Sequence, residues 1–420
     1  PEWTAMLDHT SRECARLGLG LDLTTGTGWP FGGPWITDEF ASHSLAPVRT
    51  NAAAGPLILK LPKGQPICLR AYPKDGRPVE LMSKVRKGVL KWTVPAGGCR
   101  ILGLVTRSEI QKVKRAAPGG QGYVVDPFSP ASLQRYLQHF DTPLDRLTAP
   151  QPRAHFHDSF EYYNAAWTPD FLTVFQELNG YDLRDRLPAF LGDGDPDTVA
   201  RVAYDYRSTL DHLHRSYLET WNRWAKTHGS LTRNQAHGSP GNLLDHYAVA
   251  DIPETEIFRH VDAPQIPMMQ LAASAAHLTG KTLVSAESFT WLGEHFQVKP
   301  SALKEAAGFL CLGGVNHLFY HGIPYSPEEA GWPGWLFYAS THMGPNGGLW
   351  RDLSAFNGYI ATVQEALQSG RPDTSVLLYF PVAELWSKRS DKLPLFTIHN
   401  QKDWLHGSAF HQAAMTLWEN

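Results

Sequence analysis

The chain has 420 residues, a formal net charge of −3, and 42% hydrophobic and 19% charged side chains. This length exceeds the roughly 100–150 residues of one compact domain, so one barrel with insertions or two domains would fit. Because the charge is nearly balanced and the basic residues are scattered, nucleic acid and anionic membranes are poor candidates as partners. No apolar run approaches the roughly 18–20 residues of a membrane helix.

The aromatic content is high, with 14 Trp, 15 Tyr and 19 Phe beside 19 His. Such side chains suit the binding of sugars, but a large aromatic core would give the same composition, so both interpretations stay open. The four cysteines are too few and too scattered for a disulfide framework. Cys68 and Cys99 lie in one β-rich stretch and could pair, although free buried thiols are favoured. Pro1 in place of an initiating Met suggests a processed or trimmed N-terminus.

The first half of the chain contains two kinds of sequence pattern. A helix is predicted at 3–17 and a strand at 17–25, followed by a Gly- and Pro-rich loop. Short β-type runs then alternate with turns such as PKG, KDG and PAGG, which indicates an inserted antiparallel unit. The chain is therefore divided into a barrel start at 1–45, an inserted β-rich unit at 46–122, and the remainder of the barrel at 123–420.

The second half alternates strand and helix signals. Residues 123–140 predict a strand and then a helix, with Ser129 or Ser132 as its N-cap. Further strand-like runs occupy 153–163, 230–240, 250–258, 281–291, 314–327 and 376–386. Alternating β and α elements with polar residues at strand ends are the signature of an α/β barrel. The predicted fold class is α/β with a (β/α)8-type (TIM-like) barrel, which this chain need not complete. A doubly wound sheet is the alternative, but the early loop lacks GxGxxG spacing.

Carboxyl groups at three strand ends are candidates for chemistry. Cleavage of a glycosidic bond needs one carboxyl group that donates a proton and another that activates water or attacks the sugar. Asp158 and Glu161 come first, and the aromatic neighbours of Glu161 favour the protonated form that a general acid requires. A strand-end acid that binds backbone N–H groups or an arginine is an equally good interpretation of this pair alone.

The DIPETE segment is the second place. In an extended segment Glu254 and Glu256 point to the same side, and two crowded carboxylates repel unless a cation, a shared proton or a water accounts for them. Function is therefore favoured over structure here. The third place is Glu287, directly after an apolar run, where a capping role is the alternative.

Residue types that bind sugars surround these acids. The candidates for substrate binding are Trp29, Asp158, Asn234, His237, His321 and Tyr325. Any one loop histidine is more often structural, so the prediction depends on their density across several strand ends. Neither GxSxG nor HExxH occurs, and clustered carboxylates suit a hard cation such as calcium better than zinc.

Taken in order, these motifs resemble glycoside hydrolase family 106, the α-L-rhamnosidases. The segments that carry the resemblance span about three quarters of the chain: GTGWPFGGPW, VVDPFSP, HDSFE, NQAHGSP, ADIPETE, VSAESFT, GVNHLFYHGIPYSP and WPGWLFY. The resemblance implies a barrel hydrolase that removes terminal α-L-rhamnosyl groups from glycosides or polysaccharides, with inversion and with calcium. It also favours a secreted or periplasmic location.

The resemblance assigns roles to the acids. Glu161 matches the general acid, and Glu254 or Glu256 matches the base, with a weak preference for Glu254. Glu287 matches a further essential acid, placed beside the calcium ion or the attacking water. For inversion the acid and base carboxyls should lie roughly 6.5–9.5 Å apart. Family members are usually longer, so we expect either that the first strand and the C-terminal domains lie outside this chain or that the protein is a reduced relative.

Two other functions remain open. The chain could be a carbohydrate-binding, hydrolase-like protein without turnover, or a glycosidase for a different sugar, because the acids report the bond type better than the sugar.

Overall fold

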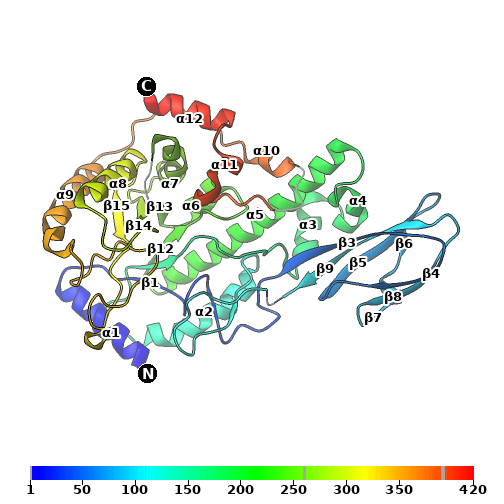
Figure 1. Ribbon diagram of the computed structural model, residues 1–420, viewed down its shortest axis with the longest axis horizontal. Coiled ribbons are helices and arrows are strands. Elements are labelled where there is room, and N and C mark those ends of the chain that lie inside the picture. The colour runs from blue at the N-terminus through cyan, green and yellow to red at the C-terminus, as the bar shows by residue number, and fades with distance from the viewer. Residues whose placement is uncertain (1, 109, 259–261, 389–392) are drawn as a thin grey trace.

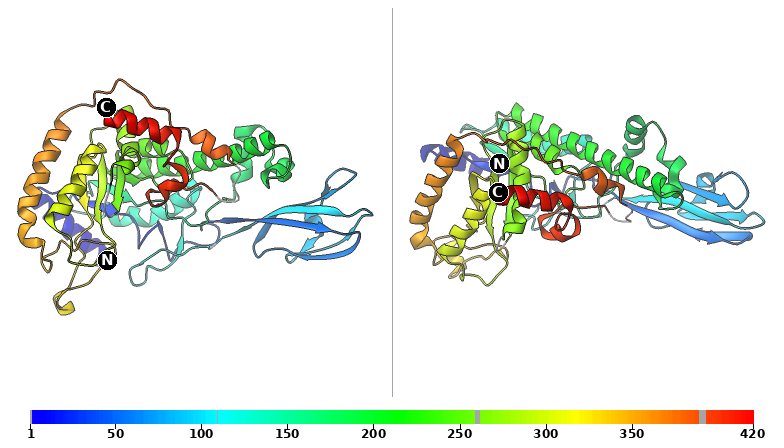
Figure 2. Two further views of the ribbon diagram at one scale, coloured as in Figure 1. Left: turned by 45° about the horizontal axis from the view of Figure 1, so that its top comes forward. Right: turned by 90° about the horizontal axis from the view of Figure 1, so that it is seen from above.

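The structure is a computed structural model that describes residues 2–108, 110–258, 262–388 and 393–420. Figure 1 shows a helix-rich body from which a long antiparallel unit projects, and the two views of Figure 2 show the same projection. The body contains a parallel sheet, and the candidate catalytic glutamates lie on its strands or shortly after them.

The sheet has six parallel strands in sequential order. They are β1 (Asp22–Thr24), β11 (Ala154–His157), β12 (Leu231–Gln235), β13 (Ile252–Phe258), β14 (Ser285–Thr290) and β15 (His317–Tyr320). The sheet is curled, since Arg153, which directly precedes β11, lies 3.2 Å from His317 of β15 (Nη1 to Nε2). The predicted α/β class is therefore correct. The described residues form a half-barrel, and no eight-strand closure is seen among them.

Helices make up most of the rest of the body (Figure 1). They are α1 (Glu2–Arg16), α2 (Pro130–Asp145), α3 (Phe171–Asn179), α4 (Leu187–Phe190), α5 (Pro196–Thr227), α6 (Leu243–Val249), α7 (Ile266–Leu278), α8 (Pro300–Leu312), α9 (Trp350–Ser369), α10 (Val382–Ser387), α11 (Gln401–Trp404) and α12 (Ala409–Glu419). Of the two predicted N-cap candidates of α2, Ser129 takes this position, and its side chain accepts a hydrogen bond from Ser132 N at 3.1 Å. α7 is buried on nearly all sides, which explains its run of Ala and Met. No helix in the described part of the chain has the length and apolarity to cross a membrane.

The inserted unit consists of two antiparallel sheets. One contains β3 (Ser44–Ala52), β9 (Cys99–Arg107), β5 (Gln65–Pro73) and β6 (Val79–Glu80), and the other β4 (Gly55–Lys60), β8 (Val89–Val94) and β7 (Val85–Arg86). Its apolar core includes Leu69, Leu81 and Leu90, all fully buried. The strands end at Arg107, and the chain then returns to the body by way of a loop. All four cysteines are free, as favoured from the sequence.

Two predicted barrel strands are absent. Tyr123–Val124 forms β10, which pairs antiparallel with β2 (Gly32–Gly33) in a separate two-stranded sheet. Residues 376–380 carry no strand although their apolar pattern suggested one. A strand needs a hydrogen-bonded neighbour, and this segment has no partner strand among the described residues. Leu377 is consequently 81% exposed.

Candidate active site

A cavity of about 520 Å³ lies at the carboxyl ends of the parallel strands. Its wall combines acids with aromatic and small side chains from segments far apart in the sequence: Trp29, Phe156, Asp158, Ser159, Glu161, Glu256, Phe258, Glu287, Thr290, Tyr320, His321, Gly322, Ile323, Pro324, Phe337, Tyr338, Ala339, Ser340 and His399. Three of the four candidate catalytic glutamates, Glu161, Glu256 and Glu287, therefore line one cavity. The volume falls in the range of small-molecule sites.

Sheet register brings the acids together. Glu256 on β13 is the register neighbour of Glu287 on β14, and Asp158 and Glu161 follow β11 two strands away. Because the carboxyl ends of parallel strands meet at one edge, acids just past these ends converge there. The sequence puts each acid at or near a strand end, and the sheet brings these strand ends together at one edge.

Glu161 is held at the cavity wall by two donors. Its Oε2 accepts a hydrogen bond from Trp29 Nε1 at 2.9 Å and forms an ion pair with Lys114. Lys114 also donates to the Tyr163 hydroxyl at 2.7 Å. The aromatic neighbours expected from the sequence are therefore accompanied by an ammonium group, which comes from a loop distant in sequence and contacts the Glu161 carboxyl group directly.

Glu254 is enclosed behind the cavity. It is 1% exposed, and it does not line the cavity. Its Oε2 lies 3.0 Å from Arg233 Nη1 and accepts from Ser285 Oγ at 2.7 Å, while its Oε1 accepts from Gln235 Nε2 at 3.1 Å. Burial raises the pKa of Glu254 although Arg233 opposes this effect. The position of Glu254 thus does not support the weak preference for it as base.

Glu256 lies at the cavity and is paired with a histidine. Its Oε2 is 2.9 Å from His237 Nε2, and its side chain is 7% exposed. Burial, and then the charges of nearby glutamates, raise the pKa of Glu256 well above its usual value. Burial lowers the pKa of His237 to about 4, so the imidazole is neutral at neutral pH.

Glu287 is positioned by its neighbours. Its Oε2 accepts from Gln235 Nε2 at 2.9 Å and its Oε1 from Thr290 Oγ1 at 2.5 Å. Gln235 therefore connects Glu287 with the enclosed Glu254. The carboxyl of Asp158 lies close enough to be affected: burial, followed by the charges of Glu287 and Glu256, raises its pKa well above the usual range. If all of these carboxyl groups were ionised, their charges would repel one another strongly inside the cavity.

The predicted sugar-binding residues divide into two groups. Trp29, Asp158 and His321 line the cavity. Asn234 is buried and accepts a hydrogen bond from His157 Nδ1 at 2.8 Å, and His237 lies behind Glu256. Tyr325 is 75% exposed and does not line the cavity, because it packs against Trp335 at the surface.

Several cavity residues were not singled out from the sequence. Phe337, Tyr338 and Ser340 come from a long loop that follows β15. Lys114, which contacts Glu161 without lining the cavity, comes from the loop after the inserted unit. His399 comes from near the C-terminus. None follows a barrel strand directly, so the strand-end rule could not find them. The WPGWLFY motif was the one available signal, since it contains Phe337 and Tyr338.

The side chains of the cavity include ligand types that suit a metal ion. Carboxylate oxygens are the ligands that calcium prefers, and the cavity supplies several. Among residues 2–108, 110–258, 262–388 and 393–420, however, no group of three or more His, Cys, Asp or Glu side chains is arranged to hold a metal ion. Glu287 and its neighbours therefore fit calcium in ligand type, and an ion would need additional oxygen ligands from the backbone, water or substrate.

Comparisons with known proteins cover most of this chain, and one of them shows its family. The chain is 26% identical over 436 residues to a protein of Formosa agariphila that carries the provisional name beta-glucuronidase, with 90% of this chain and 37% of that protein aligned. Its fold is similar to that of the solved rhamnosidase from Novosphingobium sp. PP1Y, with a TM-score of 0.69, 20% identity, and coverage of 88% of this chain and 54% of that chain. The chain thus spans between about a third and a half of the length of these proteins. The model of the alpha-L-rhamnosidase family matches residues 75–403. With most of its length matched, the chain belongs to glycoside hydrolase family 106, the alpha-L-rhamnosidase family.

Proposed function

We propose that this chain contains the active site of a glycosidase that removes terminal α-L-rhamnosyl groups from glycosides or polysaccharides. The observation that carries the proposal is the convergence of Asp158, Glu161, Glu256 and Glu287 on one aromatic-walled cavity. A pair of carboxyl groups on opposite sides of a bound sugar is what hydrolysis of its glycosidic bond requires. The aromatic rings of the wall supply apolar faces for the sugar.

The roles follow from position and from the family. Glu161 acts as general acid and donates a proton to the leaving oxygen. Trp29 and Lys114 fix its carboxyl group at the cavity wall. Glu256 acts as general base and removes a proton from the attacking water, because it reaches the cavity whereas Glu254 does not. Attack from the opposite face inverts the anomeric carbon.

Calcium is part of the proposal, with Glu287 as a ligand. The support is the donor chemistry and the crowding of Asp158, Glu256 and Glu287, whose mutual repulsion a cation would relieve. Calcium supplies a site for sugar hydroxyls when bound. Treatment with a chelator should lower hydrolysis and the melting temperature, and added Ca²⁺ should restore both. Unchanged activity and melting after exhaustive chelation would contradict this part.

Hydrolysis of β-glucuronides is the second candidate function. The name of the Formosa agariphila relative suggests this activity, and one observation favours it. The Arg115 guanidinium lies 4.6 Å from the ring centre of Tyr338 and 5.1 Å from that of Phe337, two rings of the cavity wall. No described carboxylate forms an ion pair with Arg115, so it could bind the carboxylate of a uronate sugar.

A panel of aryl glycosides tests these proposals. Release from the α-L-rhamnoside with β-configured rhamnose as the first product, seen by NMR, supports an inverting rhamnosidase. Release from the β-D-glucuronide alone would support the second candidate instead. Binding of rhamnose without any hydrolysis, across pH and with Ca²⁺ supplied, would favour a non-catalytic carbohydrate-binding protein. The Glu256→Gln variant serves as the background control.

A further inference from the structure

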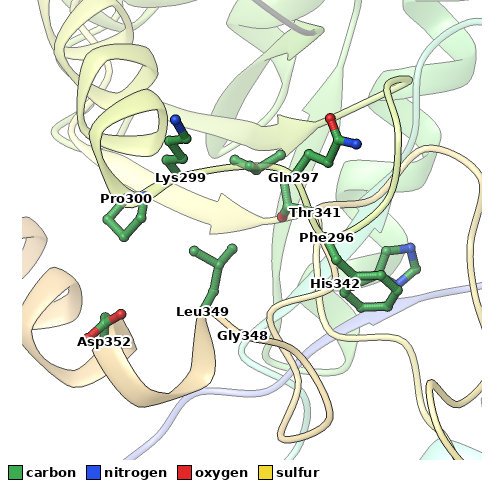
Figure 3. A pocket seen from close by; sticks show the side chains of 10 residues that line it. Phe296, Gln297, Lys299, Pro300, Thr341, His342, Gly348, Leu349 and Asp352 are labelled. Atoms are coloured by element: carbon green, nitrogen blue, oxygen red, sulfur yellow. The ribbon is translucent and has the colours of Figure 1, made fainter.

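A second cavity, of about 480 Å³, lies beside the candidate active site. The two share one segment of wall: Ala339 and Ser340 line the active-site cavity, and Thr341 and His342 line the second one. Figure 3 shows Phe296 and His342 together on one side of this cavity, and Pro300, Leu349 and Asp352 on the opposite side. The shared segment is fixed by hydrogen bonds, including Met343 N to Gly322 O at 3.0 Å.

Thr341 carries the strongest indication of a ligand. Its side chain is 1% exposed, and its hydroxyl has no hydrogen-bond partner among the described residues. A buried hydroxyl without a partner is unfavourable, so native structures nearly always supply one. Because Thr341 lines the cavity, a molecule bound there can supply the missing partner.

The remaining wall has the character of a sugar site. The Phe296 ring lies 5.4 Å from the His342 ring, and Trp332 stacks on Phe296 with ring centres 6.1 Å apart. Trp332 is 78% exposed, and its Nε1 donates to Asn346 O at 3.2 Å, which fixes the ring at the surface. Phe296 and His342 have positive φ angles of 64° and 51°, which is unfavourable backbone for such residues. Strain of this kind is frequent where a ligand is held.

Polar side chains complete the wall. Gln297, Lys299 and Asp352 line the cavity together with the aromatic rings. They offer both donors and acceptors, which is what the hydroxyl groups of a sugar need. A purely apolar ligand would leave the Thr341 hydroxyl without a partner.

We propose that the second cavity binds a further sugar unit of the same glycan whose terminal residue is cleaved in the neighbouring cavity. The proposal rests on the proposed function for the identity of the glycan, and on Thr341 and Phe296 for the site itself. The unit stacks on the aromatic wall and accepts or donates a hydrogen bond at the Thr341 hydroxyl. The shared segment 339–343 separates the two sugar positions.

The test compares a substrate that can reach both cavities with one that cannot. The first is a rhamnosyl-terminated trisaccharide, and the second an aryl α-L-rhamnoside. Thr341→Val should lower kcat/KM for the trisaccharide roughly three- to tenfold, as for the loss of one hydrogen bond. Phe296→Ala should lower it by about tenfold or more. Both variants should keep kcat/KM for the aryl rhamnoside within about twofold.

Thermal unfolding distinguishes a ligand-binding role of Thr341 from a structural role. Removing a hydroxyl that has no protein partner should leave the melting temperature of Thr341→Val unchanged or higher. Thr362→Val, on the exposed face of α9, is the matched control and should alter neither quantity. A trisaccharide preference that survives both cavity variants, or a lower melting temperature for Thr341→Val, would overturn the inference.

If the wild type cleaves neither substrate, the proposed function fails, and calorimetric titration of the trisaccharide into wild type and Thr341→Val then tests the cavity alone. Equal affinity of the two would overturn the inference.

Discussion

Replacing Glu256 with glutamine removes a carboxylate at the cavity while keeping the size of the side chain. If Glu256 is the base, kcat should fall by about 10²- to 10⁴-fold, the usual contribution of a positioned base. Stability should not fall with it. Burial and neighbouring charges raise the pKa of Glu256 well above its usual value, so its ionised form is unfavourable in the folded state. A neutral amide should therefore leave the melting temperature unchanged or raise it.

The same change at Glu254 should lower stability, although burial raises the pKa of Glu254 too, because the buried Arg233 would lose an ion-pair partner. Its carboxyl group lies 3.0 Å from Arg233 Nη1, with both side chains buried. Glutamine would leave the guanidinium with Asp22, whose Oδ2 is 3.5 Å from Arg233 Nε, as its other acidic partner. Breaking a buried pair costs roughly 3–5 kcal/mol, and the remaining Asp22 contact suggests the lower end, about 3 kcal/mol. Turnover per folded molecule should fall much less than in Glu256→Gln, because Glu254 does not line the cavity.

The assay combines hydrolysis of an aryl α-L-rhamnoside with guanidinium unfolding of each variant. Arg233→Met/Glu254→Leu is the control for the ion pair, since removing both charges should recover much of the stability that one removal loses. The reasoning would be refuted if Glu254→Gln abolished turnover with an unchanged unfolding midpoint while Glu256→Gln remained active. Glu254 would then be the base.

Two further changes are predicted. Lys114→Met should lower kcat/KM by roughly 10- to 100-fold, because the Glu161 carboxyl group loses a partner that fixes its position, and a displaced catalytic group reacts poorly. The exposed Lys112, two residues away, gives the control variant Lys112→Met, for which steady-state kinetics should show no change. The melting temperature should fall as pH drops from about 6.5 towards 4, because burial lowers the pKa of His157 to about 4 and the unfolded chain takes up a proton that the folded chain refuses. A His157→Gln variant should show a shallower dependence over this window, and an unchanged slope would contradict the assignment.

The sequence was sufficient for the local elements. The helix at 3–17, the N-cap at Ser129 and the antiparallel character of the inserted unit each depend on residues close together in the chain. The convergence of Glu161, Glu287 and one of the two DIPETE glutamates on one cavity also followed from the sequence, since carboxyl ends of parallel strands share an edge. Regular geometry made that one long-range inference possible.

Other features depended on neighbours in space that the sequence pattern does not identify. Apolar residues at 376–380 have the composition of a strand, but a strand exists only beside another, and no neighbour is placed there among the described residues. Which PETE glutamate reaches the cavity was likewise left open. Alternation puts Glu254 and Glu256 on the same side, and only the three-dimensional position of Arg233 separates their surroundings.

The amino-acid sequence by itself determined which acids stand at strand ends and most of the segments that form sheet, insertion and helix, because these depend on short-range periodicity and turn chemistry. Only the tertiary structure decided what each acid meets: Lys114 beside Glu161, Arg233 beside Glu254 and His237 beside Glu256. Such pairs join residues through the curl of the sheet and the path of long loops. Charge and burial at a carboxyl group are set by those neighbours in space, and sequence order does not encode them.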